Sequence, residues 1–298
     1  MSKKNVQVIL NPSAGSKNPP LRLFNNLFHK ADFEWDLVIT KDRCDGICLA
    51  EKAIKDGADI VAAYGGDGTV MEVASGLQGT DIPMAILPGG TGNILSIELG
   101  IPQNLEEACK LITQPVNSKI RAIDLGVTND PVVPAFALRA GVGLEAAMLE
   151  GTDRELKERY GIFAYIMGAT QALYNISEAH YNLILDGVKV ECFGLTCLIA
   201  NAAYFGVPGL VLDPKVRIDD GFLDVFVLRK MDLIDLFSLA ATLVGGYELK
   251  DPTLHWQVQS VTIESEPVQA TQADGEMWGE SPITIHAQKG ALKVIVPA

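Results

Sequence analysis

The sequence reads DIVAAYGGDGT over residues 59–69, a mostly apolar run followed by a turn with three glycines and a threonine. The run has the length and composition of a buried strand, and the turn is typical of a strand-to-helix connection. The same order occurs twice more. Residues 6–10 (VQVIL) precede NPSAG at 11–15, and residues 83–87 (PMAIL) precede PGGTGN at 88–93.

The segments around these runs predict the fold class. Residues 35–40 have the composition of another strand, and residues 46–56 have an apolar stripe at helical spacing. Strands that alternate with helices predict a parallel sheet. After about residue 124 strand-like runs follow one another, which predicts an antiparallel β-sandwich or barrel. These runs cover residues 179–185, 188–200, 223–228, 260–264 and 283–286.

Two helices are expected to interrupt the strands of the second part, at residues 153–174 and 231–247. We predict one domain over residues 1–125, to which residues 290–298 return, and a second over residues 126–289. The sequence leaves the oligomeric state open.

Composition excludes some classes of partner. The chain has 298 residues, and its net charge of −13 disfavours nucleic acid as the main partner. The same charge predicts that any contact with an anionic membrane is local and transient. The apolar run at residues 6–10 is too short for a signal-peptide core, so a cytoplasmic location is expected. The five cysteines form no CxxC pair and are expected to be reduced thiols.

The glycine turns predict a phosphate site. Turns that leave the carboxyl ends of parallel strands meet at one edge of the sheet, and glycine lets the backbone approach an anionic ligand. Each turn alone could equally be a tight connection. The expected contacts are Gly65, Gly66 and Gly68 around phosphate, a hydroxyl from Thr69, magnesium or ribose at Asp67, and a second set at Thr91, Gly92 and Asn93.

Two acidic turns supply candidate groups for phosphoryl transfer, which needs a phosphate cradle, magnesium and a proton-accepting carboxylate. Asp274 and Glu276 flank Gly275; they share a face if the segment is extended and diverge if it turns at the glycine. We favour Glu276 as the base, with Asp274 as the alternative. Asp220, before a strand, suits a hard cation, although the composition of both segments is also that of ordinary β-turns.

The ordered set of motifs resembles the catalytic domain of the diacylglycerol kinase and sphingosine kinase family, and most closely its bacterial soluble lipid kinases. The resemblance spans nearly the whole chain. Besides the glycine turns it includes Asp124-Leu125-Gly126, Ala140-Gly141-Val142-Gly143, Asn201 with Tyr204-Phe205-Gly206, Asp219-Asp220-Gly221-Phe222-Leu223-Asp224 and Asp274-Gly275-Glu276.

The resemblance implies a three-layer α/β nucleotide-binding domain of NAD kinase type, an all-β sandwich domain with added helices, and the cofactors ATP and Mg²⁺. It implies a base at Glu276 or Asp274, and a structural magnesium at Asp220 with the backbone carbonyls of Arg217 and Phe222; Asp124 is expected to orient the metal or the base. The implied ATP contacts are Asn11, Thr40, Gly66, Asp67, Gly68, Thr69, Val70, Met71, Glu72 and Thr91.

The chain departs from the family pattern at three positions. Met71 stands where asparagine is frequent, Ile94 where an acid is frequent, and Glu145 where aspartate is common. The preferred hypothesis is an ATP-dependent lipid kinase that acts on a diacylglycerol-like hydroxyl at the inner membrane surface. The alternatives are a kinase of a soluble substrate, such as an NAD kinase relative, and a nucleotide-binding regulatory protein without catalysis.

A lipid substrate also requires contact with the membrane. The helix expected at residues 153–174 carries apolar residues, including Phe163 and Ile166, beside basic ones. It is a hypothetical membrane contact or acceptor gate, and the competing interpretation is a helix packed on the sandwich.

Overall fold

The computed structural model describes residues 3–15, 20–31, 33–128, 135–143, 178–204, 211–229 and 253–298. Contacts within the chain divide it into two compact units. Unit 1 comprises Met1–Ile123 with Gly290–Ala298, and unit 2 comprises Asp124–Lys289.

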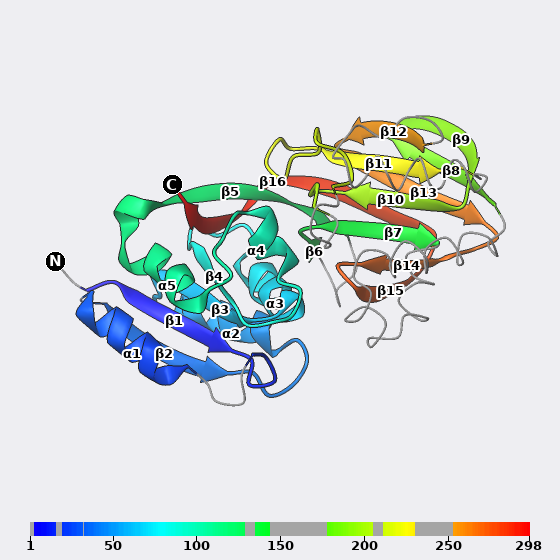
Figure 1. Ribbon diagram of the computed structural model, residues 1–298. Coiled ribbons are helices and arrows are strands. Elements are labelled where there is room, and N and C mark those ends of the chain that lie inside the picture. Colours follow the sequence, from blue (N-terminus) through cyan, green and yellow to red (C-terminus); the bar gives the residue numbers. More distant parts are fainter. Residues whose placement is uncertain are drawn as a thin grey trace, which may run out of the picture. The chain divides into compact units, whose positions relative to one another are not determined.

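A parallel β-sheet forms the centre of unit 1 (Figure 1). The order β2-β1-β3-β4 joins strands in parallel register, and Val294 of β16 lies opposite Met84 in parallel. Every residue of β3 and β4 is buried, so these runs are continuously apolar rather than alternating. The strands are β1 (Asn5–Leu10), β2 (Glu34–Ile39), β3 (Ile60–Gly65), β4 (Met84–Pro88) and part of β16 (Ile283–Pro297).

Helices connect the strands of unit 1 and cover its sheet. Helix α1 packs with α5, and α2 packs with α3. Aromatic rings attach α1 to the sheet, because Phe24 lies 5.9 Å from Tyr64 and 6.3 Å from Trp35 between ring centroids. The helices are α1 (Leu21–Lys30), α2 (Asp45–Lys55), α3 (Asp67–Leu77), α4 (Ile94–Glu98), α5 (Leu105–Thr113) and the 3₁₀ turn η1 (Pro115–Asn117).

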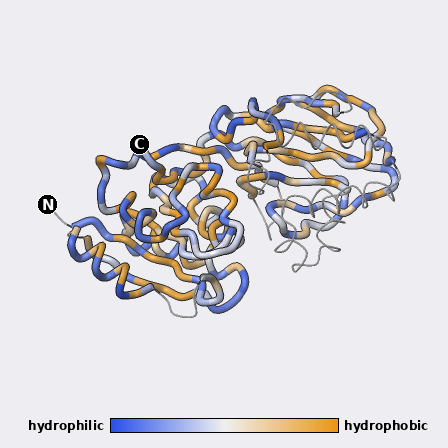
Figure 2. Tube along the Cα trace, viewed as in Figure 1, coloured by the Kyte–Doolittle hydropathy of each residue, from blue (hydrophilic) through white to orange (hydrophobic). Residues whose placement is uncertain are grey.

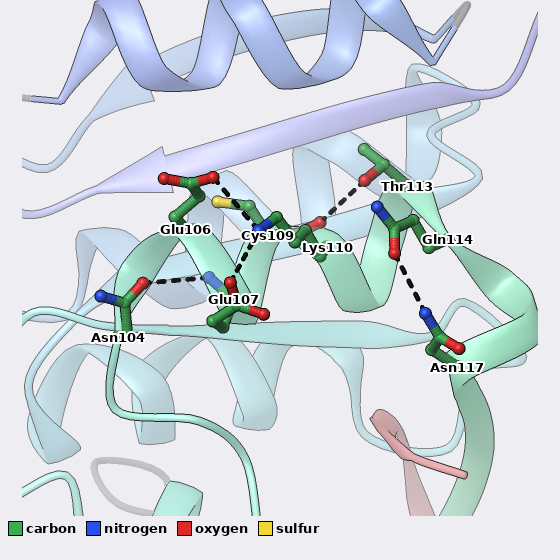
Figure 3. A network of polar contacts seen from close by, with 8 residues as sticks. All are labelled: Asn104, Glu106, Glu107, Cys109, Lys110, Thr113, Gln114 and Asn117. Carbon is green, nitrogen blue, oxygen red and sulfur yellow. Dashed lines mark hydrogen bonds and ion pairs between the residues drawn. The ribbon is translucent and has the colours of Figure 1, made fainter.

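Helix α5 shows how local sequence defines a helix start (Figure 3). The side chain of Asn104 accepts a hydrogen bond from the backbone N–H of Glu107 at 3.1 Å, which satisfies one of the free donors in the first turn. Lys110 pairs with Glu106 and Glu107 on the exposed face. The cap therefore sets where α5 begins, and the ion pairs add little because they are solvated.

Replacing Asn104 with alanine is expected to destabilise unit 1 by about 1 kcal/mol, because the N–H of Glu107 loses its acceptor. Chemical denaturation followed by the fluorescence of Trp35 and the other tryptophans would measure the change. Asn104→Asp is the matched control, since aspartate caps equally well. Equal stability of the two variants would show that the cap contributes nothing.

Unit 2 is built from antiparallel strands. One sheet has the order β12-β11-β10-β7-β14-β15, and the other contains β16, β13, β8 and β9. The strands are β5 (Ser118–Val127, shared with unit 1), β6 (Ala135–Phe136), β7 (Arg139–Gly143), β8 (Ala179–Leu185), β9 (Val188–Gly194), β10 (Thr196–Ala200), β11 (Leu223–Leu228), β12 (Thr253–Val258), β13 (Ser260–Glu266), β14 (Ala270–Ala273), β15 (Glu276–Glu280) and β16.

The inner faces of the two sheets form one core. Alternate residues of β8, such as Tyr181 and Leu183, pack with Ile199 and Val225 of the other sheet and with Ile263 of β13. Strand β8 alternates strictly between buried and half-buried residues, as expected for a sheet that buries one face. Figure 2 shows hydrophobic residues gathered along the strands.

The predicted fold class is confirmed, with a parallel α/β sheet followed by an antiparallel β-sandwich. The single strand predicted at residues 188–200 is wrong, because β9 and β10 belong to different sheets. The chain changes sheets at Gly194 and Leu195, where the Leu195 N–H donates to the Leu228 carbonyl at 2.7 Å. A Cβ at Gly194 would lie 2.5 Å from the Val227 Cγ1, so only glycine fits this crossing.

The helices predicted at residues 153–174 and 231–247 lie outside the described residues. None of the helices in the described ranges combines the length and the apolar composition needed to cross a bilayer.

Candidate functional site

Three turns converge at the carboxyl edge of the parallel sheet in unit 1. The Asn11 side-chain amide, after β1, donates to the Thr69 hydroxyl, after β3, at 2.8 Å. The turn after β4 lies against the same turn, because a Cβ at Gly90 would be only 2.6 Å from the Gly66 Cα. The convergence predicted from strand order is therefore present.

The glycines of these turns divide into two kinds. A Cβ at Gly65 would lie 2.5 Å from the Thr69 Cβ, and the Gly90 position is equally crowded, so the packing of the protein itself requires glycine there. At Gly66 the nearest described atom to an added Cβ would be 3.5 Å away, and at Gly68 no atom of the described residues would lie within 4 Å. Gly68 is exposed at the start of α3. Nothing in the described fold requires glycine at position 68.

The start of α3 presents backbone N–H groups beside this open space. The first N–H groups of a helix have no intrahelical acceptor, and Gly66 at the N-cap supplies no side-chain cap. The exposed Thr91 belongs to the neighbouring turn. A bound phosphate needs hydrogen-bond donors and space close to the backbone. Backbone N–H groups and a hydroxyl supply the donors here, and the missing Cβ of glycine supplies the space.

Two side chains that the sequence predicts as ligand contacts are engaged with the turns themselves. The Asp67 carboxylate accepts the backbone N–H of Ile94 at 2.6 Å. The Asn93 side chain accepts from the Gly90 N–H and donates to the Gly90 carbonyl, both at 2.9 Å. Burial raises the pKa of Asp67, and its backbone hydrogen bonds offset part of that rise. Both residues therefore maintain the turn after β4.

Glu72 also has a partner that the sequence does not reveal. Its two carboxylate oxygens accept the backbone N–H groups of Cys44 at 2.9 Å and Gly46 at 3.0 Å, at the start of α2. This bond ties α3 to the connection after β2, which also contains Thr40. Thr40 is buried, with its N–H bonded to the Leu10 carbonyl at 3.0 Å.

The remaining residues that the sequence predicts as ATP contacts differ in how far they are buried. Val70 is 3% exposed and belongs to the core, while Met71 is half-buried. Gly92 is exposed, and its backbone lies close to the Asp67 carboxylate, since a Cβ there would be 2.8 Å from the Asp67 Oδ2.

In unit 2, Asp274 and Gly275 form the two-residue turn between β14 and β15. Both have positive φ, at 46° and 87°, and Ala273 pairs with Glu276 across the turn. These features are typical of a type I′ hairpin, which Asp-Gly favours. The chain therefore turns at Gly275, and the two carboxylates are not neighbours on one extended face.

The Asp274 carboxylate holds the loop before β7. It accepts N–H groups from Ala137 at 2.8 Å and Arg139 at 2.9 Å, with longer contacts to Leu138. Burial raises the pKa of Asp274 to about 6, although these three backbone donors act in the opposite direction. Glu276 opens β15 and is half-buried.

The second acidic turn of unit 2 is organised around a buried carboxylate. Asp124 Oδ2 accepts the Gly221 N–H at 2.5 Å, and the Asp124 N–H donates to the Ile218 carbonyl at 2.8 Å. Asp220 accepts the Phe222 N–H at 3.0 Å through one oxygen and the Gln257 amide at 3.0 Å through the other.

The charges around Asp220 fit a hard cation. Burial raises the pKa of Asp220, and the carboxylates of Asp224 and Asp124 raise it further. Asp224 Oδ2 is buried, and no described residue gives it a hydrogen bond. The described residues contain no group of three or more His, Cys, Asp or Glu arranged as a metal cluster, so the fit rests on Asp220 with backbone oxygens such as those predicted at Arg217 and Phe222.

Sequence reasoning missed the pairing of Asp224 with His255. The two side chains meet at 2.7 Å, and the imidazole stacks on Phe226 with ring centroids 4.2 Å apart. The position of Asp224 within the otherwise apolar run of β11 was a signal that its carboxylate needs a buried partner. The identity of that partner depends on the register between β11 and β12.

Two family models match successive parts of the chain. Residues 5–128 match the model of the diacylglycerol kinase catalytic domain, and residues 139–296 match the model of the YegS C-terminal NAD kinase beta sandwich-like domain. The chain belongs to the diacylglycerol kinase catalytic-domain family. Members of this lipid kinase family with similar sequences include a diacylglycerol kinase of Mycobacterium tuberculosis H37Rv, 28% identical over 264 residues, or 87% of this chain and 84% of the relative.

Two further relatives define the extent of the similarity. An uncharacterized protein of Synechocystis is 33% identical over 257 residues, which are 83% of this chain but 57% of the length of that relative. The crystal structure of a diacylglycerol kinase from Bacillus anthracis has a TM-score of 0.78 and 26% identity, and the match covers 99% of this chain and 98% of the other. The similarity therefore includes both units.

Proposed function

We propose that this chain is an ATP-dependent lipid kinase that transfers the γ-phosphate of ATP to a hydroxyl of a diacylglycerol-like lipid. The observation that carries the proposal is the vacant Cβ position at Gly68, beside the uncapped first turn of α3 and the exposed Thr91. Membership of the diacylglycerol kinase family supports the choice of a lipid hydroxyl as acceptor.

The roles of the turns in unit 1 follow from their contacts. The backbone N–H groups at residues 66, 68 and 69 and the hydroxyl of the exposed Thr91 bind the phosphates, whereas the Asp67 N–H donates to its own carboxylate. The Asn11 amide orients the Thr69 hydroxyl by a hydrogen bond. Glu72 accepts the N–H of Cys44 and so fixes the segment after β2 that contains Thr40. Binding of this kind positions the γ-phosphate and balances its charge, which is most of what phosphoryl transfer requires.

In unit 2, Glu276 is the proposed base that accepts the proton of the acceptor hydroxyl. Asp274 is the weaker candidate because its carboxylate is already bonded to three N–H groups of the loop before β7. Mg²⁺ would be held by the Asp220 carboxylate and the backbone carbonyls of Arg217 and Phe222. Asp124 would support this turn through its bond to the Gly221 N–H. When bound, the metal would offset the mutual repulsion of these carboxylates and order the turn.

The location of the reaction is part of the proposal. A chain with a net charge of −13 and a lipid substrate would act in the cytoplasm and touch the inner membrane surface only during turnover. Flotation with vesicles should show weak binding that does not increase with the fraction of anionic lipid. Strong retention on phosphatidylglycerol vesicles would contradict this location.

The test of the function is incubation with γ-labelled ATP, Mg²⁺ and one acceptor at a time: diacylglycerol, phosphatidylglycerol, ceramide, sphingosine or NAD. We expect label in the organic phase with diacylglycerol. Label in the aqueous phase with NAD would instead identify a kinase of a soluble substrate, and ATP binding without transfer to any acceptor would identify a regulatory protein.

A further inference from the structure

The first turn of α3 and the turn after β4 are joined by a single carboxylate. Asp67 Oδ1 accepts the backbone N–H of Ile94 at 2.6 Å and that of Leu95 at 3.4 Å. Asn93, the residue at the N-cap of α4, makes no side-chain cap, because its amide is bonded to Gly90. The acceptor for this turn therefore comes from a residue 27 positions earlier in the chain.

The other oxygen of the same carboxylate faces the same turn. A Cβ at Gly92 would lie 2.8 Å from Asp67 Oδ2, so the backbone of Gly92 closely approaches this oxygen. The carboxylate thus lies against this turn, and the backbone N–H groups of Ile94 and Leu95 are donors to its Oδ1. These N–H groups stabilise the negative charge of the carboxylate in part.

The Asp67 carboxylate is partly shielded from solvent. Loss of solvation raises the pKa of Asp67, and backbone N–H groups, rather than any cationic side chain of the described residues, act to lower it. Oδ1 of Asp67 is engaged with the N–H groups of Ile94 and Leu95, and Oδ2 lies near Gly92.

We infer that Asp67 is a positioning residue, whose carboxylate fixes the turn after β4 so that Thr91 stands beside the first turn of α3. This role deepens the proposed function and rests on it, since it assigns Thr91 and the α3 donors to the phosphates of ATP. It replaces the direct contact with magnesium or ribose expected from the sequence.

The test compares Asp67→Asn with Asp67→Ala. Asparagine keeps an oxygen that can accept the Ile94 N–H, while alanine removes the acceptor. We expect Asp67→Ala to weaken ATP binding by at least about 30-fold and Asp67→Asn to restore affinity to within about threefold of the original, with the Mg²⁺ concentration for half-maximal activity unchanged in both. Equal losses in the two variants, or a Mg²⁺ requirement raised tenfold by Asp67→Asn, would overturn the inference.

A second measurement does not depend on catalysis. Amide hydrogen exchange at Ile94 and Leu95 should accelerate in Asp67→Ala and stay slow in Asp67→Asn. Asp81→Ala is the matched control, because the Asp81 side chain is 96% exposed and pairs only with Lys293 in the described contacts. Unchanged exchange in Asp67→Ala would refute the positioning role even if the chain binds ATP, and accelerated exchange in a chain that binds no ATP would refute only the proposed function.

Discussion

Replacing Gly68 with alanine is expected to weaken ATP binding strongly and to leave the fold at least as stable. An alanine Cβ at this position would meet no atom of the described protein within 4 Å. Gly68 lies in α3, where alanine is favoured over glycine by about 1 kcal/mol. The methyl group would instead occupy the space proposed for the phosphates.

We expect the affinity for ATP to fall at least about 100-fold, equivalent to about 2.7 kcal/mol of binding free energy. Isothermal titration would measure the affinity, and thermal unfolding would measure the stability of the same samples. Gly65→Ala is the matched control, because its Cβ would lie 2.5 Å from the Thr69 Cβ and should destabilise the fold as well as binding. ATP affinity unchanged in Gly68→Ala would place the phosphates elsewhere.

Replacing Glu276 with glutamine is expected to lower kcat by about 1,000-fold, because an amide cannot accept the hydroxyl proton. The affinity for ATP should stay within about twofold of that of the original protein, since Glu276 does not belong to the turns proposed to bind the phosphates. Single-turnover transfer of labelled phosphate to diacylglycerol would measure the chemical step, and equilibrium titration would measure the affinity.

Asp274→Asn is the comparison for this experiment. Asparagine tolerates the positive φ at this position but offers one carbonyl oxygen where the carboxylate receives three N–H groups. We expect a loss of stability of about 1 to 3 kcal/mol and a smaller loss of kcat than in Glu276→Gln. If Asp274→Asn stays folded and loses turnover while Glu276→Gln remains active, Asp274 is the base.

The strands and the glycine turns were predictable because their signals are local. The fully buried strand β3 is continuously apolar and the half-buried strand β8 alternates, and the turn after each carries glycine where the backbone must bend or approach another segment. The error at residues 188–200 has the opposite cause. The crossing at Gly194 depends on the position of Val227 in another strand, which no local pattern encodes.

The sequence indicated which acidic residues belong to the candidate site, but it did not indicate what each of them contacts. Asp67, Glu72 and Asp274 were all expected near ligands, and each is bonded to backbone N–H groups of a segment distant in sequence. The separations are 27, 28 and 137 residues. Sequence spacing cannot show such partners, because they depend on how separate loops approach one another.

By itself, the sequence determined the order of strands and turns, the change from an α/β to a β-rich part, and the set of residues able to handle phosphate. These features arise from hydrophobic period and backbone conformation, which act between near neighbours in the chain. Only the tertiary structure decided which carboxylates support loops and where glycine leaves space for a ligand. A carboxylate accepts whichever donors the fold brings within about 3 Å, and steric room is likewise a property of the assembled loops.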